Sequence, residues 1–267
     1  MSQHGMGLDD IAIARLAERI ETAQTYATPI RKLTDDYPEM TVADAYRVQT
    51  ALRRSYEARG QRVVGWKAGL TSRPKMLQMG VEQPGIGFLT DAMARPENTV
   101  ISLSDMIHPR AECEIAFVTG AELAGHVTRE QVLAATDYIQ PSVEIIDSRF
   151  TGFKFDLESV LADNSSSARF ISGGRPRRPG SIDLRTIGTV MELNGEIVAL
   201  GASAEVLGHP ADAVAMLVGV LHDMGEPLPA GSFVMSGAIT AAVPVKPGDC
   251  LTARFLDMGS ISVRFGE

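Results

Sequence analysis

A chain of 267 residues in which 45% are hydrophobic can bury a full core, and its composition is not that of a disordered protein. Its formal net charge of −8 argues against a nucleic-acid-binding surface. The two cysteines are too few for a disulfide scaffold or a structural zinc site, and no run reaches transmembrane length. We therefore expect a cytoplasmic protein that binds neither nucleic acid nor a membrane.

The first 61 residues are expected to be mainly helical. Apolar residues recur at helical spacing between positions 8 and 25. Thr41 and Asp44 fit a capping box that opens a second helix, and Gly60 closes it. The next segment, 62–70, is apolar and rich in glycine, which is typical of a strand. We therefore expect the helical region to end at about residue 61.

The remaining residues, 62–267, favour short strands with two helices. The helices are predicted from Thr128 to about Tyr138, and from the His209-Pro210 pair to near Gly225. Asn194-Gly195 predicts a two-residue hairpin, and further strands are expected at 233–236, 251–255 and 261–265. Strands and helices do not alternate regularly, and no nucleotide-binding glycine motif follows a strand. The sequence therefore predicts a single α+β domain, 1–267, with a large mixed or antiparallel sheet.

Three glutamates interrupt apolar, strand-like segments. Glu112 and Glu114 lie two residues apart, so they point to the same face of a strand, and Glu144 interrupts a second apolar run. A solvated strand face is one interpretation of the Glu-x-Glu pair. A buried carboxylate, however, is costly unless it is paired or bound to a metal. Three carboxylates without a matching Cys/His set suit Mg²⁺ or Mn²⁺, and the apolar context of Glu144 favours this metal site.

Lys67 is the one lysine in the glycine-flanked apolar segment 62–70. One interpretation is that its charged end reaches solvent from a strand edge. The other is functional: the ammonium group holds a carboxylate or enolate oxygen of a substrate, or moves a proton. The polar segment 147–167 lines a site or forms a solvated loop. Residues 236–240 follow a strand and offer backbone N–H groups suited to a carboxylate. His108, which precedes proline, is either a catalytic base or an ordinary loop residue.

Five motifs, in order from about Tyr37 to the C-terminus, resemble the hydratase/decarboxylase family of aromatic meta-cleavage pathways, in the fumarylacetoacetate hydrolase superfamily. They are GWKAGLT at 65–71, HPRAECEI at 108–115, VEIIDSR at 143–149, ADN at 162–164 and LGHP at 207–210. The resemblance implies a mixed β-sheet roll with helices packed outside. It also implies that Mg²⁺ or Mn²⁺ is bound by Glu112, Glu114 and Glu144 and that Lys67 is the active-site lysine. We expect the substrate to be bound by Leu70, Asp163, Ser166 and Thr240.

The family has a hydratase branch, acting on 2-hydroxypenta-2,4-dienoate, and a branch that decarboxylates 2-oxohex-3-enedioate. The segments 36–41, 75–81 and 153–157 resemble the decarboxylase branch, and Gly85 stands where hydratases tend to carry an acid. We therefore expect metal-dependent decarboxylation in aromatic catabolism, with the hydratase reaction as the alternative. An acylpyruvate C–C hydrolase that uses His108 as base, and a non-enzymatic scaffold subunit, are further alternatives. The family also implies a homo-oligomer and a possible complex with the sister hydratase.

Overall fold

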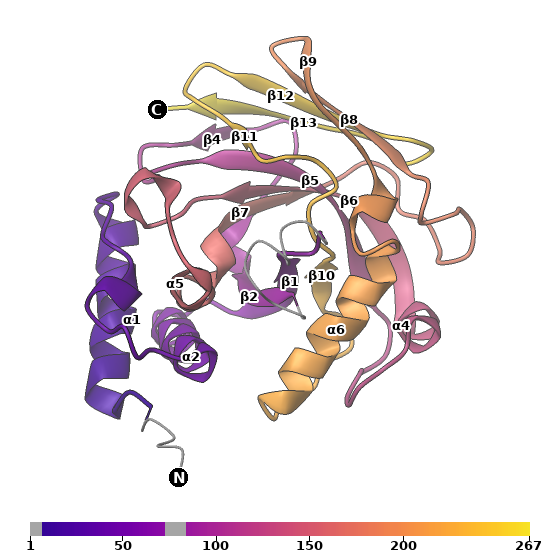
Figure 1. Ribbon diagram of the computed structural model, residues 1–267. Helices are drawn as coiled ribbons and strands as arrows, with labels where there is room; N and C mark the ends of the chain where they lie inside the picture. The colour runs from indigo at the N-terminus through magenta and orange to yellow at the C-terminus, as the bar shows by residue number, and fades with distance from the viewer. Residues whose placement is uncertain (1–6, 73–83) are drawn as a thin grey trace.

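Two β-sheets organise the protein, for which a computed structural model describes residues 7–72 and 84–267 (Figure 1). The strands are β1 (Val63–Gly69), β2 (Gly85–Thr90), β3 (Ala94–Arg95), β4 (Val100–Ser102), β5 (Arg110–Thr119), β6 (Thr136–Ile146), β7 (Ser167–Ser172), β8 (Gly188–Leu193), β9 (Glu196–Ala202), β10 (Phe233–Met235), β11 (Val243–Pro244), β12 (Cys250–Phe255) and β13 (Gly259–Gly266). The larger sheet has the order β2-β1-β10-β5-β6-β7-β3, with β11 beside β5, and the smaller sheet has the order β4-β13-β12-β8-β9. Parallel and antiparallel pairs both occur, so the sheet is mixed, as predicted.

The larger sheet is curled into a roll. Lys67 on β1 and Glu144 on β6 are separated by the strands β10 and β5, yet their Nζ and Oε2 atoms are 3.2 Å apart. Strands in a sheet are spaced by about 4.8 Å, so a flat sheet would hold these two strands about 14 Å apart. The curl therefore brings side chains from distant strands into one interior. Figure 1 shows the labelled strands β1, β2, β10, β5, β6 and β7 surrounding this interior.

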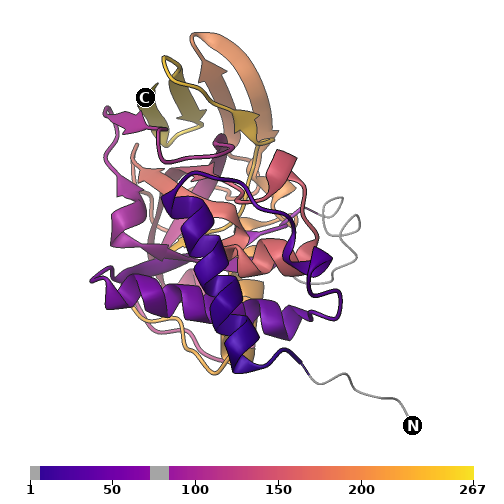
Figure 2. The same ribbon diagram turned by 90° about the vertical axis from the view of Figure 1, so that its left-hand side faces the viewer.

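Helices cover the outside of the roll. They are α1 (Asp10–Thr25), α2 (Val42–Ala58), α4 (Arg129–Ala135), α5 (Leu157–Ala162) and α6 (Pro210–Asp223), with single 3₁₀ turns η1 (Leu33–Asp35), η2 (Asp91–Met93), η3 (Thr151–Phe153), η4 (Asn164–Ser166) and η5 (Ser203–Glu205). Asp9 caps α1, and the predicted capping box of Thr41 and Asp44 is present at the start of α2. Figure 2 shows α1 crossing α2 on one side of the molecule.

The N-terminal helices share one apolar core with the sheets. Leu16 of α1 and Leu52 of α2 belong to the same buried cluster as strand residues of both sheets. The Gln49 side chain of α2 donates hydrogen bonds to the carbonyl oxygens of Ile86 on β2 and Leu161 on α5, at 2.9 and 2.7 Å. These bonds fix α2 against β2 and α5.

Most predicted elements are present, with two corrections. The helix after Thr128 ends at Ala135 rather than near Tyr138, because β6 begins at Thr136 and pairs with β5 along the whole hairpin. The polar segment 147–167 contains a helix, α5, which Asp156 caps through its side chain. Asn194 and Gly195 both have positive φ, as the predicted two-residue hairpin requires. The segment 75–81 lies outside the described residues.

One apolar stretch, Ser203–Asp223, has the length and hydropathy of a membrane-spanning helix. Within the protein, however, 61% of its most apolar window is buried, and its α6 portion packs most of its side chains into the core. Because the core helix of a globular protein passes the same test of length and composition, we interpret α6 as a core helix.

Candidate metal centre

The β5–β6 hairpin brings the three predicted glutamates together. Its register places Glu112 directly opposite Glu144, and Glu114 lies two residues further along β5 on the same face. One carboxylate oxygen from each of the three lies within 4.8 Å of the other two. All three side chains are buried, with Glu114 and Glu144 each only 1% exposed. The solvated strand face is therefore excluded for these residues.

The three buried carboxylates repel one another. Burial, followed by the neighbouring carboxylates of Glu144 and Glu112, raises the pKa of Glu114 well above its ordinary range. Burial also raises the pKa of Glu144, although the nearby Lys67 ammonium opposes this rise. Carboxylate oxygens are the ligands that hard divalent cations prefer, and a cation at their centre would relieve this repulsion. The donor set therefore fits Mg²⁺ or Mn²⁺.

Neighbouring groups fix the orientation of two of these carboxylates. The Lys67 Nζ lies 3.2 Å from Glu144 Oε2, and the Ser167 hydroxyl donates to Glu144 Oε1 at 3.3 Å. The backbone N–H of Gly237 donates to Glu114 Oε2 at 2.8 Å. Gly237 has φ of +114°, and any Cβ there would collide with the Thr71 side chain, so only glycine fits. Of the N–H groups predicted at 236–240, that of Gly237 thus binds a carboxylate of the protein itself, whereas those of Ser236 and Ile239 donate to backbone carbonyl oxygens of β5.

A cavity of about 30 Å³ lies at the cluster. The predicted residues Lys67, Leu70, Glu112, Glu114 and Glu144 line it, together with Ala68, Gly69, Thr71, Ser72 and Ala238. Leu70 directly follows β1 and has a left-handed backbone, with φ of +60°, which is uncommon for a bulky residue. The cavity has room for an ion or a water beside the three carboxylates.

Three predicted substrate-binding residues do not line this cavity. Asp163 is fully buried and forms an ion pair with Arg149, which also donates its backbone N–H to Asp163 Oδ2 at 3.2 Å. Thr240 accepts a hydrogen bond from the backbone N–H of Cys113, between the two β5 glutamates, at 3.2 Å. Ser166 is 3% exposed, and among the described residues its hydroxyl has no hydrogen-bond partner.

Sequence reasoning missed the support that Arg149 gives to the site. Its guanidinium is fully buried and also donates to the carbonyl oxygens of Asp147, Asp163 and Ser167. Burial raises the pKa of Asp163 to about 6, although Arg149 opposes this rise. The pair anchors the turn η4, whose three residues all have positive φ, just before Ser167 contacts Glu144. An arginine inside the motif VEIIDSR was the only sequence signal.

The two histidines that precede proline lie away from the cavity. His209 caps α6, because its Nδ1 accepts a hydrogen bond from the Ala211 N–H at 3.1 Å. The His108 ring packs edge-on against Phe153, with ring centroids 6.3 Å apart. His108, the base of the hydrolase alternative, is not among the residues that line the cavity.

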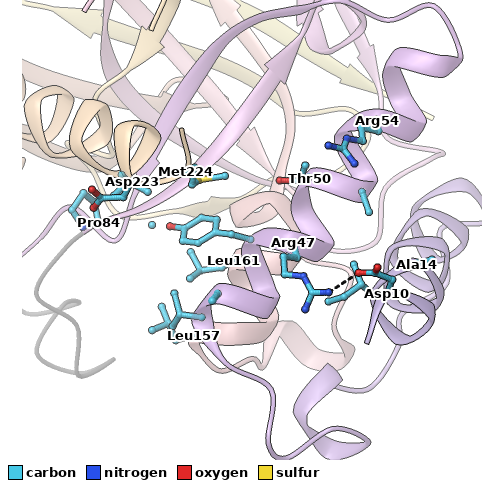
Figure 3. Close-up of a pocket in the computed structure, with 17 residues that line it drawn as sticks. Asp10, Ala14, Arg47, Thr50, Arg54, Pro84, Leu157, Leu161, Asp223 and Met224 are labelled. Carbon is cyan, nitrogen blue, oxygen red and sulfur yellow. Dashed lines mark hydrogen bonds and ion pairs between the residues drawn. The ribbon is translucent and has the colours of Figure 1, made fainter. Parts of the chain in front are cut away.

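A much larger groove, of about 1000 Å³, lies among α1, α2, α5 and α6 (Figure 3). Its lining is mainly apolar, and Arg47 points toward Asp10 at its edge, forming an ion pair of 2.7 Å. The groove shares no lining residue with the cavity at the glutamate cluster. Size alone would favour this groove, but the titratable groups that can do chemistry are at the small cavity.

No family model matches the chain. It is 57% identical to the 4-oxalocrotonate decarboxylase of Pseudomonas sp. strain CF600, over 95% of this chain and 96% of that protein. It is 41% identical to the 2-hydroxyhexa-2,4-dienoate hydratase of Comamonas testosteroni, over 95% of this chain and 96% of the hydratase. The structure of 4-oxalocrotonate decarboxylase from Pseudomonas putida G7, complexed with magnesium and adipate, has a TM-score of 0.96 at 53% identity, covering 98% of this chain and 100% of that one.

The chain therefore belongs to the hydratase/decarboxylase family. Within that family, its identity to the 4-oxalocrotonate decarboxylase of strain CF600 exceeds its identity to the hydratase by a wide margin. A more distant structure, fumarylpyruvate hydrolase from Pseudomonas aeruginosa, shares the fold alone, with a TM-score of 0.57 at 15% identity, over 75% of this chain and 88% of that one. The predicted fumarylacetoacetate-hydrolase-like roll is thus confirmed.

Proposed function

We propose that the protein is a 4-oxalocrotonate decarboxylase that converts 2-oxohex-3-enedioate into 2-hydroxypenta-2,4-dienoate and CO₂, using Mg²⁺ or Mn²⁺. The observation that carries this proposal is the buried cluster of three glutamates beside Lys67, in a chain 57% identical to an enzyme of that name. A related structure that contains magnesium and adipate, a six-carbon dicarboxylate like the substrate, supports it further.

Glu112, Glu114 and Glu144 would hold the cation. A bound divalent cation supplies Lewis-acid stabilisation of the negative charge that develops on the substrate's C2 oxygen. The chain supplies partly apolar surroundings, because Ala68, Leu70 and Ala238 are among the residues that line the cavity. Less water around the reacting oxygen strengthens every charge interaction with it.

The reaction breaks the C5–C6 bond and releases C6 as CO₂. The electron pair of that bond forms a C4–C5 double bond, the C3–C4 pair moves to C2–C3, and the C2 carbonyl oxygen takes the negative charge. Lys67 is the one cationic side chain among the residues that line the described cavity, so we assign it to hold or protonate this oxygen. Leu70, Asp163, Ser166 and Thr240 stay predictions as substrate-binding residues.

Gly85 supports the decarboxylase over the hydratase because hydratases tend to carry an acid at this position. A Cβ atom at Gly85 would lie 2.5 Å from Leu161 Cδ2, the end of a flexible side chain, so Leu161 would have to shift to admit an acid. The missing acid favours a reaction that needs no added water.

A paired assay tests the proposal. Purified protein treated with EDTA is given 2-oxohex-3-enedioate with and without Mg²⁺, and CO₂ release is followed. We expect CO₂ only with Mg²⁺, and a loss of both turnover and Mg²⁺ binding in Glu144→Gln. No CO₂ release, but metal-dependent consumption of added 2-hydroxypenta-2,4-dienoate, would assign the hydratase reaction instead, and release of pyruvate would assign a C–C hydrolase.

We also propose that the protein is one domain of 267 residues that acts in the cytoplasm and forms a homo-oligomer. The shared core of the N-terminal helices and the sheets supports the single domain, and the two free cysteines fit a reducing compartment. The edge strand β9 exposes Ile197, Val198 and Leu200, which supports self-association. Light scattering on the purified protein, alone and mixed with the sister hydratase, tests both the homo-oligomer and a complex with that enzyme.

A further inference from the structure

A serine on the metal-binding hairpin has an unused hydroxyl. Ser142 lies on β6 directly opposite Glu114, and two residues before Glu144 on the same face. Its side chain is 0% exposed, and among the described residues its Oγ has no hydrogen-bond partner. A buried hydroxyl without a partner lowers stability, so a position like this needs an explanation from a ligand or a water.

The length of the serine side chain decides what its hydroxyl can reach. Opposite residues on paired antiparallel strands have Cβ atoms about 4.5–5.5 Å apart, so Ser142 is an immediate neighbour of Glu114. A glutamate carboxylate, however, is two bonds further from the backbone than a serine hydroxyl. The carboxylate oxygens can therefore extend further from the strands than the Ser142 Oγ, and Ser142 is not among the residues that line the cavity. We therefore do not expect Ser142 to bind the cation directly.

A bridging water can link the Ser142 hydroxyl to a cation that the three glutamates bind. Mg²⁺ has six ligands in octahedral geometry and usually keeps several waters, so three carboxylates leave positions that water can take. An Mg–O bond of about 2.1 Å followed by a hydrogen bond of about 2.8 Å would link the cation to a hydroxyl that does not bind it directly. The hydroxyl can accept a hydrogen bond from such a water, because serine has two acceptor lone pairs.

We propose that Ser142 is a positioning residue of the metal centre, whose hydroxyl holds a water in the coordination shell of the cation. This inference rests on the proposed function, because it requires that Glu112, Glu114 and Glu144 bind a divalent cation. Partners of this kind typically change metal affinity or activity by 10–100-fold when they are removed. Ser142 thereby joins Ser167 and Gly237 as groups that orient the ligands rather than bind the cation.

The test compares Ser142→Ala with Thr189→Val. Thr189 on β8 also carries a buried hydroxyl without a partner among the described residues, but it lies in the smaller sheet. Mg²⁺ binding to the metal-free proteins is measured by titration calorimetry without substrate, and melting temperature is measured with and without Mg²⁺. We expect the Mg²⁺ dissociation constant of Ser142→Ala to rise about 10-fold, and that of Thr189→Val to stay at the wild-type value.

The metal-free melting temperature separates this role from a structural one. Ser142→Ala removes an unpaired group, so without metal it should melt no lower than wild type. Its kcat at saturating Mg²⁺ should change less than its Mg²⁺ dissociation constant. Wild-type affinity in Ser142→Ala, or a lower metal-free melting temperature, overturns the inference. Absence of Mg²⁺ binding by the wild-type protein overturns the proposed metal site itself.

Discussion

The repulsion within the glutamate cluster predicts that one conservative change strengthens the metal-free fold. Glu114→Gln keeps the size of the side chain and an oxygen that can accept the Gly237 N–H, but removes one of three charges. At the 4.8 Å limit between ligand oxygens, each carboxylate pair repels by about 3.5 kcal/mol at an effective dielectric constant of about 20. Glu114 has two such neighbours, and Lys67 offsets part of the repulsion.

Protonation sets an upper limit on this cost. At neutral pH, placing a proton on a carboxylate of ordinary pKa near 4.3 costs about 3.7 kcal/mol, because each pKa unit is worth about 1.4 kcal/mol. Glu114 can therefore never destabilise the metal-free protein by more than that amount. We expect Glu114→Gln to raise the free energy of unfolding by about 2–3 kcal/mol, or the melting temperature by about 4–12 °C.

Magnesium should reverse the order of the two proteins. A ligand at 1,000 times its dissociation constant adds about 4.1 kcal/mol to the folded state, which is more than the advantage of Glu114→Gln. The wild type should gain this stabilisation, and Glu114→Gln should not. Urea unfolding at neutral pH, with EDTA and then with excess Mg²⁺, measures both effects. Glu192→Gln, in an ion pair with Arg254 on the other sheet, is the matched control and should show neither. A metal-free Glu114→Gln protein that unfolds at or below the wild-type urea concentration would refute the electrostatic reasoning.

Three further outcomes follow from the site. Lys67→Met should lower kcat by about 100-fold or more while changing the Mg²⁺ dissociation constant less; equal losses in both would remove Lys67 from the chemistry. Because the pKa values of Glu114 and Glu144 are raised, protons should compete with Mg²⁺ at pH values above the ordinary glutamate range, so calorimetry should show affinity falling as the pH is lowered. In this pH range the folded metal-free protein binds more protons than the unfolded chain, so the free energy of unfolding of the metal-free protein should rise as the pH falls. A Mg²⁺ affinity that does not change with pH would contradict the raised pKa values on which both expectations rest. Arg149→Met leaves a buried carboxylate unpaired and should cost about 3–5 kcal/mol in urea unfolding, whereas the exposed Arg185→Met should change little; equal effects would show that the buried pair is unimportant.

The sequence located the glutamates because strand periodicity is local. The two-residue spacing of Glu112 and Glu114 is enough to place both on one face, and the apolar neighbours of Glu144 indicate burial. Likewise, the capping residues of α2 and the Asn194-Gly195 turn are predicted from a few consecutive positions. These features depend on neighbours in the chain, so the chain alone predicts them.

Features that depend on pairing partners were not predictable in the same way. The β5–β6 register decides that Ser142 lies opposite Glu114, and no local pattern encodes that register. The end of the helix after Thr128 was misjudged because pairing with β5 overrides local helical spacing from Thr136 onward. Similarly, the composition of the polar segment 147–167 is compatible with a solvated loop, although Arg149 and Asp163 at its two ends form a buried ion pair.

The hairpin register also separates two requirements of the enzyme. All three proposed cation ligands come from β5 and β6, which follow each other as strands, with α4 between them, and pair along their length. Lys67, in contrast, comes from β1 and reaches Glu144 only because the sheet curls. Contacts close in sequence form with a smaller loss of chain entropy than contacts between distant strands. One local pair of strands thus supplies every proposed cation ligand, whereas Lys67 reaches the site only in the completed roll. Cation binding and turnover therefore place different demands on the fold.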